Sequence, residues 1–217
     1  MEFTMAKKTN VSEDAKEIAQ SLLSIDAVQL GSEGQFTWAS GIKSPVYCDN
    51  RRVNSEVNIR RQVITAFVKL IEKEFPKVEV IAGVATGGIS FGALIAEKMS
   101  KPFIYVRQEK KEHGLMKQVE GYATEGQKVV LIEDHISTGG SSMKALNGLK
   151  EANLDVLGII SIMTYGFKKA GDLFTQNKIR YYSLCDLDTA LDVALKSQKI
   201  NLAQRDSILK FRDSIGG

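Results

Sequence analysis

Cysteine, proline and histidine are all scarce in this sequence. Its 217 residues include two cysteines, three prolines and two histidines. Cys48 and Cys185 are far apart, and neither has a histidine at metal-ligand spacing, so neither a disulfide framework nor a zinc site is indicated. The few prolines and the lack of low-complexity tracts argue against an interdomain linker. The length and the 43% hydrophobic content therefore predict a single α/β domain over residues 1–217.

Long hydrophobic runs and a strong net charge are also missing. No run approaches the roughly 18 apolar residues of a membrane-spanning helix, and residues 1–4 lack the pattern of a signal peptide. The net charge of +3 is too small to imply a nucleic-acid surface. We therefore expect a soluble, cytoplasmic protein with neither a membrane nor a nucleic acid as its partner.

The most informative stretch is residues 128–142. Residues 129–132 form an apolar, β-branched run that predicts a strand buried on both faces. Glu133 and Asp134 follow at its C-terminal end, and residues 137–142 (STGGSS) lead into a helical pattern. Glycines and hydroxyls at the start of a helix favour an anion, and carboxylates accept hydrogen bonds from hydroxyls. A phosphate carried on a sugar with vicinal hydroxyls would satisfy both parts.

Two other phosphate-binding loops are excluded. No lysine follows these glycines as in G-x-x-x-x-G-K-[ST], and there is no G-x-G-x-x-G. A buried strand, two acids, a short spacer and Thr-Gly-Gly-Ser instead resemble the phosphoribosyl-pyrophosphate (PRPP) motif of the type I phosphoribosyltransferases. The alternative is an ordinary βα turn with Gly and Ser at a helix cap. The resemblance implies a Rossmann-like α/β fold, in which a mostly parallel sheet is flanked by helices.

The same resemblance implies roles for the residues of the motif. Glu133 and Asp134 would hold the ribose hydroxyls, and Ser137–Ser141 would hold the 5′-phosphate. Ser137 would also reach the base. His135 stands where the family usually has an apolar residue, and it is left without a role. The implied PRPP-binding residues of the motif are Glu133, Asp134, His135, Ile136, Ser137, Thr138, Gly139, Gly140 and Ser141.

Residues 35–51 predict a β-hairpin that a doubly wound core does not need. Its Phe-Thr, Ser-Gly and Ser-Pro pairs resemble the N-terminal hood of one branch of the family, the orotate phosphoribosyltransferases. The alternative is a structural hairpin in which Trp38 and Tyr47 cover the core. Ala39 stands where many members have a lysine, so Lys43 or Arg51 would have to substitute. Arg51 suits a planar, carboxylated base better, because a guanidinium binds bidentately.

Two further loops resemble parts of the same family. The turn formed by Ala85, Thr86, Gly87 and Gly88 would cradle pyrophosphate through backbone N–H groups, although some members have a lysine where Gly87 stands; the alternative is a close-packing turn. Residues 107–121 are long and polar for a connection, and loops of this kind are usually functional.

The 107–121 segment resembles the catalytic loop of the orotate phosphoribosyltransferases. Arg107, Lys111 and His113 fall at the catalytic and PRPP-binding positions, whereas Gln108 replaces a frequent lysine. The alternative is a solvated charged loop. The arginine that binds orotate in many members is missing from residues 164–167, which again points to Arg51 or to backbone donors for the binding of orotate.

Hydrophobic periodicity predicts the remaining elements. Helices are expected at residues 12–23, 55–75, 89–99, 169–174, 188–196 and 201–213, and strands at 27–30, 78–82, 103–106, 156–163 and 180–184. The hood should lie mainly in residues 25–52, the core in about 54–185 and the C-terminal helices in 186–215.

The resemblance implies an activity as well as a fold. The chain would transfer ribose 5-phosphate from PRPP to orotate, with Mg²⁺ held through the substrates and no direct protein ligand. It would act as a homodimer with shared active sites. The alternatives are a purine phosphoribosyltransferase, which would lack the hood and the 107–113 pattern, and a PRPP-sensing regulator, which would usually carry a DNA-binding segment.

Overall fold

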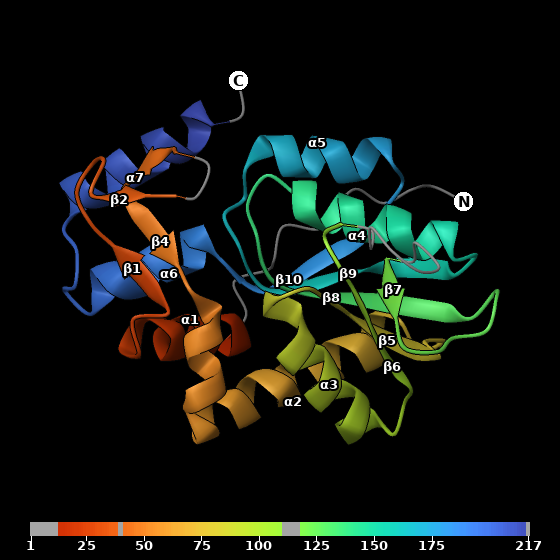
Figure 1. Cartoon of the computed structure of the whole chain (residues 1–217). Helices are drawn as coiled ribbons and strands as arrows, with labels where there is room; N and C mark the ends of the chain where they lie inside the picture. The colour runs from red at the N-terminus through yellow and green to blue at the C-terminus, as the bar shows by residue number, and fades with distance from the viewer. Residues whose placement is uncertain (1–12, 39–40, 110–117, 216–217) are drawn as a thin grey trace.

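The computed structural model describes residues 13–38, 41–109 and 118–215. A six-stranded sheet with the order β10-β9-β8-β5-β6-β7 forms its centre (Figure 1). Neighbouring strands are parallel except β6 and β7, which are antiparallel. The predicted mostly parallel sheet is therefore confirmed. Its strands are β5 (Val80–Val84), β6 (Phe103–Val106), β7 (Val119–Glu120), β8 (Lys128–Ile136), β9 (Asp155–Thr164) and β10 (Tyr181–Asp186).

Helices cover both faces of this sheet (Figure 1). α2 (Val57–Glu74) and α3 (Gly87–Met99) lie on one face, and α4 (Gly140–Glu151) and α5 (Lys168–Gln176) lie on the other. Alternate residues of β8 point to opposite faces, as strand geometry requires. Val130 and Ile132 pack into the core beneath α2, whereas the odd-numbered residues beside them pack beneath α4. Burial on both faces explains the continuous apolar run in the sequence.

The hood is built from both ends of the described chain (Figure 1). Its two small antiparallel sheets pair β1 with β4 and β2 with β3. The ring of Trp38 lies 6.0 Å from that of Phe211, and Lys199 donates to the carbonyl of Leu23 at 2.8 Å, so the C-terminal helices pack against the N-terminal segment. The elements are α1 (Glu13–Ser24), β1 (Val28–Leu30), β2 (Phe36–Thr37), β3 (Lys43–Ser44), β4 (Val46–Cys48), α6 (Leu187–Lys196) and α7 (Leu202–Ser214).

Several element boundaries differ from the expected ones. A 3₁₀ helix, η1 (Asn50–Ser55), precedes α2, so the long helix begins two residues later than predicted. α3 begins at Gly87 rather than at residue 89. β8 continues to Ile136, past the end of the apolar run. Among the described residues, no helix is long and apolar enough to span a membrane.

Candidate active site

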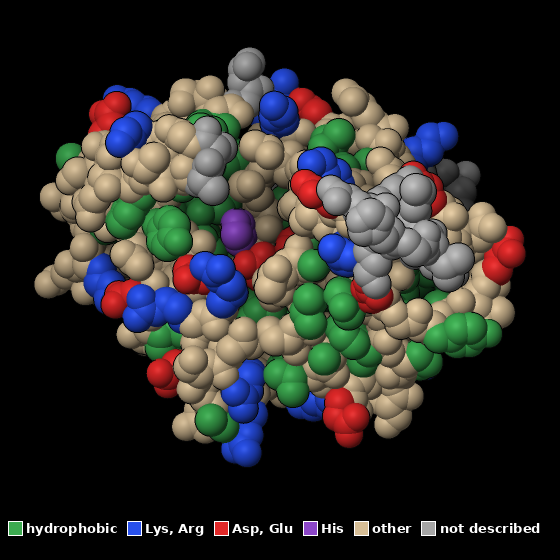
Figure 2. Space-filling view, in the orientation of Figure 1, with side chains coloured by type: hydrophobic (Ala, Val, Ile, Leu, Met, Phe, Trp, Pro, Cys, Tyr) green, Lys and Arg blue, Asp and Glu red, His purple; other side chains and the backbone are tan. Residues whose placement is uncertain are grey.

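A cavity of about 430 Å³ lies where the hood meets the C-terminal ends of β5, β8 and β9. Figure 2 shows a hollow on this face, in which acidic and basic side chains and one histidine gather. Ligands of open α/β sheets bind at this end of the strands. The lining residues are Trp38, Tyr47, Cys48, Asp49, Arg51, Thr86, Gly87, Asp134, His135, Ser137 and Tyr165.

The two acids of the PRPP motif lie inside β8 rather than after it. Glu133 pairs in register with Ser161 of β9, so the acidic pair belongs to the strand ladder. The two carboxyl groups still interact, since the charge of Asp134 and a hydrogen bond to it both act on the pKa of Glu133. Asp134 lines the cavity, whereas Glu133 accepts hydrogen bonds from the hydroxyls of Ser142 at 3.1 Å and Ser141 at 3.4 Å. The structure therefore brings one acid, not both, to the cavity wall.

Burial makes the two acids titrate differently. Glu133 is only 4% exposed, and burial together with the neighbouring Asp134 charge raises its pKa well above the ordinary value. Burial also acts to raise the pKa of Asp134, but its interactions with His135, together with a hydrogen bond to Glu133, outweigh this effect and lower the pKa. The geometry thus favours a neutral Glu133 beside an ionised Asp134.

His135 contacts Asp134 through both its backbone and its ring. The backbone N–H of His135 donates to Oδ1 of Asp134 at 2.9 Å, and its Nδ1 lies 3.2 Å from Oδ2. Nδ1 is buried and is not aligned for a hydrogen bond, so the ring contact is an ion pair when His135 is protonated. Burial lowers the pKa of His135, but the Asp134 carboxylate more than offsets this and raises it. The sequence left His135 without a role; the structure places it in the cavity wall.

The loop between β8 and α4 has a conformation that requires glycine. Gly139 has φ of +79°, in the left-handed region, and α4 begins at the next residue. A Cβ at Gly139 would lie 3.1 Å from the ring of Phe174. Ser137 lines the cavity, and Ile136 is buried in the core. Any contact that Ile136 makes with a ligand would therefore use its backbone.

The first βα turn lies directly against the acidic motif. A Cβ at Gly87 would be 2.4 Å from the carboxyl carbon of Asp134, and one at Gly88 would be 2.3 Å from the carbonyl oxygen of Ile132. Both glycines therefore serve close packing, which was the alternative interpretation of this turn. Thr86 and Gly87 also line the cavity. The peptide bond between Ala85 and Thr86 is cis.

The hood contributes a cation to the cavity and a hydrogen bond to the acidic motif. Nε of Arg51 lies 2.6 Å from Oδ1 of Asp49, and this hydrogen bond lowers the pKa of Asp49. The Arg51 side chain is 61% exposed and reaches the cavity edge. Between them in sequence, the buried Asn50 donates from Nδ2 to the carbonyl oxygen of Asp134 at 2.8 Å. The hood is thereby tied to the acidic motif.

Sequence reasoning missed five residues of the lining as site residues. Trp38 and Tyr47 were considered only as core cover, and no signal marked Cys48 or Asp49 beyond their place beside Arg51. Tyr165 packs edge-on against Trp38 at 5.1 Å. A signal for Tyr165 was available, because it follows β9, the strand next to β8, at the ligand-binding edge of the sheet.

The predicted catalytic loop is described only at its ends. The backbone N–H of Arg107 donates to the carbonyl of Gln118 at 3.0 Å, and its guanidinium lies 3.7 Å from Glu120. These contacts join the ends of the antiparallel β6–β7 connection. Arg107 is not in the cavity lining. Lys111 and His113 lie outside the described residues.

Comparisons with known proteins agree with this geometry. Residues 51–189 match the family model described as phosphoribosyl transferase domain. The orotate phosphoribosyltransferase of Staphylococcus aureus (strain Mu50) is 47% identical over 201 residues, which cover 93% of this chain and 99% of that protein. That of Staphylococcus haemolyticus is 43% identical, over 93% of this chain and 100% of that protein. The crystal structure of orotate phosphoribosyltransferase from Aeropyrum pernix aligns with a TM-score of 0.72 and 31% identity, over 81% of this chain and 96% of that one.

Proposed function

The chain belongs to the orotate phosphoribosyltransferases, and from this premise we propose how its residues divide the work between the two substrates. The enzyme transfers ribose 5-phosphate from PRPP to orotate, which gives orotidine 5′-phosphate and pyrophosphate in pyrimidine (UMP) synthesis. One observation carries the proposed division. An acid of the PRPP motif, a serine of the phosphate loop and a cation of the hood line the same cavity.

The reaction depends mainly on how the protein positions the two substrates. The bond between C1 of the ribose and the pyrophosphate breaks, the ribose gains oxocarbenium character, and N1 of orotate attacks C1. Orotate is already an anion, so no strong general base is required. The protein contributes by orienting the two substrates and by stabilising the charge that develops on the departing pyrophosphate.

PRPP is held from both ends. The 5′-phosphate binds in the loop Ser137–Ser141, where the left-handed Gly139 and the start of α4 present backbone N–H groups to an anion. Asp134 accepts hydrogen bonds from the ribose hydroxyls at the cavity wall. Glu133 lies against Ser141 and Ser142, so its contact with the ribose requires it to release Ser142.

Pyrophosphate is placed beside the turn from Ala85 to Gly88, which lies directly against Asp134. The N–H of Ala85 already donates to the carbonyl of Val106, so the donors come from the start of α3, where Thr86 and Gly87 line the cavity. Arg107, Lys111 and His113 close over the pyrophosphate from the β6–β7 connection. Arg107 is half-exposed and paired at 3.7 Å with Glu120, a contact that it can exchange for a substrate phosphate at little cost.

Mg²⁺ is carried by PRPP in this proposal. Among the described residues, no group of three or more His, Cys, Asp or Glu side chains is arranged to hold a metal ion. Mg²⁺ usually keeps waters and substrate phosphates as ligands, so such a group is not needed. When bound, the ion neutralises charge on the pyrophosphate. The chain then orients the substrate that carries it.

Orotate binds between the hood and the motif. Ser137 and Arg51 both line the cavity, and Arg51 is the hood cation that can bind a carboxylate bidentately.

The family resemblance also implies a homodimer in which the catalytic loop of one subunit closes over the site of its partner.

A base-selection assay tests the proposal. The purified protein is incubated with PRPP, Mg²⁺ and, in separate reactions, orotate, uracil, adenine, guanine or hypoxanthine, and pyrophosphate release is measured. We expect release with orotate and at most a trace with the other bases. Release with a purine but not with orotate would overturn the proposal.

A further inference from the structure

The two ring nitrogens of His135 lie in different surroundings. Nδ1 is buried and faces Oδ2 of Asp134 at 3.2 Å. The side chain is nevertheless 31% exposed and lines the cavity, so the remaining edge of the ring, with Nε2, is directed toward the open space. Figure 2 shows a histidine side chain in this hollow.

The ring is held in this orientation from two sides. It packs edge-on against Tyr165, with the ring centres 6.0 Å apart. Asp134, on its other side, is anchored by Asn50, which donates to its backbone carbonyl at 2.8 Å. His135 is therefore a preorganised cavity residue rather than a freely moving surface side chain.

Protonation of His135 changes the balance of charges around the cavity. Asp134 on β8 and Asp49 at the end of β4 contribute two negative charges, and Arg51 contributes one positive charge. With a neutral His135 this group carries a net negative charge, which repels a carboxylate. With a protonated His135 the group is balanced, and Nε2 becomes a second donor.

Other titratable groups also face His135. Burial raises the pKa of Cys48 and of Tyr165 well above their ordinary values, so both stay neutral near pH 7. Burial and the Asp134 charge raise the pKa of Glu133, whose carboxyl accepts a hydrogen bond from Ser142 and is not in the cavity lining. Tyr47 lines the same wall. A variant that lacks only the imidazole is therefore needed to isolate the contribution of His135.

We propose that protonated His135 is a specificity-determining residue of this enzyme, which donates from Nε2 to the carboxylate of orotate. This inference rests on the proposed function. It supplies the second cation that the C-terminal end of β9 lacks, because residues 164–167 contain no arginine. It also assigns a role to a side chain whose other nitrogen is already committed to Asp134.

Two variants test the proposal. His135→Leu removes the donor and the charge, and His135→Gln keeps a neutral donor. We expect His135→Leu to raise the KM for orotate about 10–100-fold near pH 6.5, the range for losing one hydrogen bond to a charged group. The KM for PRPP should change much less. His135→Gln should fall between the wild type and His135→Leu.

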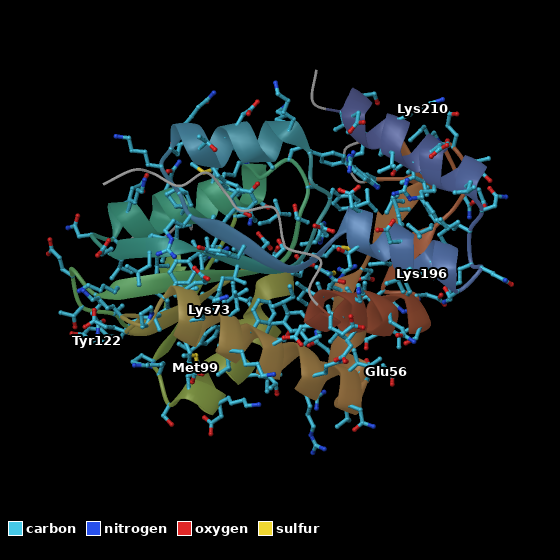
Figure 3. All side chains as sticks on the ribbon, turned by 180° about the vertical axis from the view of Figure 1, so that it is seen from behind. Glu56, Lys73, Met99, Tyr122, Lys196 and Lys210 are labelled. Atoms are coloured by element: carbon cyan, nitrogen blue, oxygen red, sulfur yellow. The ribbon has the colours of Figure 1, made fainter. Side chains whose placement is uncertain are left out.

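The pH profile separates binding from a structural role. Because Asp134 raises the pKa of His135, the imidazolium is present below that pKa and is lost as the pH rises through it. The KM of the wild type for orotate should therefore rise with pH, whereas the KM of either variant should lack this rise. Lys73→Leu is the charge-matched control, because Lys73 is 78% exposed on the far face, at the C-terminal end of α2 (Figure 3).

Each outcome has a distinct meaning. Equal KM values for orotate in the wild type and His135→Leu, or the same pH dependence in both, would overturn the inference. A change confined to the KM for PRPP would also overturn it, because His135 would then only position Asp134. A wild type that does not use orotate at all would refute the proposed function instead. Thermal unfolding of both variants reports any folding defect, and His135→Gln still tests the pH dependence if His135→Leu is unstable.

Discussion

The cavity has two sides that the chain builds in different ways. One side, here called the motif side, is the continuous run from Glu133 to Ser142 at the end of β8 and the start of α4. The other, the assembled side, consists of Trp38, Tyr47–Arg51 and Tyr165, which come from the hood and from the end of β9. The motif side fixes its geometry through local backbone and strand pairing. The assembled side depends on tertiary packing, such as the ring contact of Trp38 with Tyr165.

This difference indicates on which side of the cavity the loss of one residue can be compensated by a residue from another segment. On the motif side, Gly139 and the carboxylate of Asp134 meet requirements that no residue elsewhere in the chain can supply. On the assembled side, a cation can come from any segment that reaches the cavity. Residues 164–167 contain no arginine, and Arg51 lines the cavity on this side, whereas His135 belongs to the motif side. The predictions below test this contrast.

The largest effect should come from a residue that belongs to neither side. Lys111→Ala should lower kcat by about 10²–10³, the usual scale for removing one preorganised charge stabiliser. PRPP binding should be disturbed less, because the motif side is intact and loop closure serves mainly the chemical step. Steady-state kinetics and calorimetry with PRPP measure the two effects. A variant with unchanged kcat would remove Lys111 from the mechanism.

Subunit mixing tests whether Lys111 acts in the partner's site. Asp134→Ala damages the motif side of its own chain, so hybrids with Lys111→Ala would hold one doubly damaged and one intact site. Random mixing places hybrids in about half of the dimers, and activity should rise toward about a quarter of the wild-type value per site. Confirmed subunit exchange without any rise in activity would show that each chain completes its own site.

The next largest effect should come from the acid of the motif side. Asp134→Asn keeps the shape and removes the charge, so charged hydrogen bonds to the ribose become neutral ones. We expect kcat/KM for PRPP to fall by about 10–100-fold. Asp172→Asn is the matched control. Asp172 forms an exposed surface pair with Lys168, so this variant should leave kcat/KM for PRPP unchanged. Unchanged kinetics for both Asp134→Asn and Glu133→Gln would exclude the ribose assignment.

A smaller effect should come from the backbone of the phosphate loop. Gly139→Val should weaken PRPP and orotidine 5′-phosphate binding about 10-fold, because a β-branched residue disfavours the left-handed conformation and its Cβ would crowd Phe174, which shifts the phosphate loop. The affinity for orotate alone should be less affected. Gly126→Val is the control. Gly126 has φ of +80° but no atom within 4 Å of its Cβ position, so its replacement strains the backbone as Gly139→Val does but crowds no neighbouring side chain. Intact PRPP binding by Gly139→Val in calorimetry would contradict this prediction.

The same contrast explains what the sequence could predict. The parallel sheet and most helices follow from local periodicity and from turn chemistry, and the structure confirms them. The extension of β8 to Ile136 was missed, because polar residues enter the ladder only through pairing with β9. The place of α7 beside the hood was missed too. It depends on contacts such as Trp38 with Phe211, which no short-range pattern encodes.

The smallest effect should come from the assembled side, where Arg51→Lys keeps the charge but loses the planar fork of the guanidinium. We expect the KM for orotate to rise about 3–10-fold, since a lysine makes fewer hydrogen bonds to a carboxylate and is not preorganised for them. The KM for PRPP should stay within about two-fold, because Arg51 reaches the cavity from the hood and not from the motif. Arg52→Lys is the matched control, because Arg52 is an exposed neighbour outside the cavity lining.

Combining Arg51→Lys with His135→Leu should raise the KM for orotate by more than the product of the two single increases if both cations hold the same carboxylate. A strictly multiplicative loss would show that they act on different parts of the substrate. An equal loss of PRPP and orotate in Arg51→Lys would erase the boundary between the two sides, because the hood would then serve both substrates.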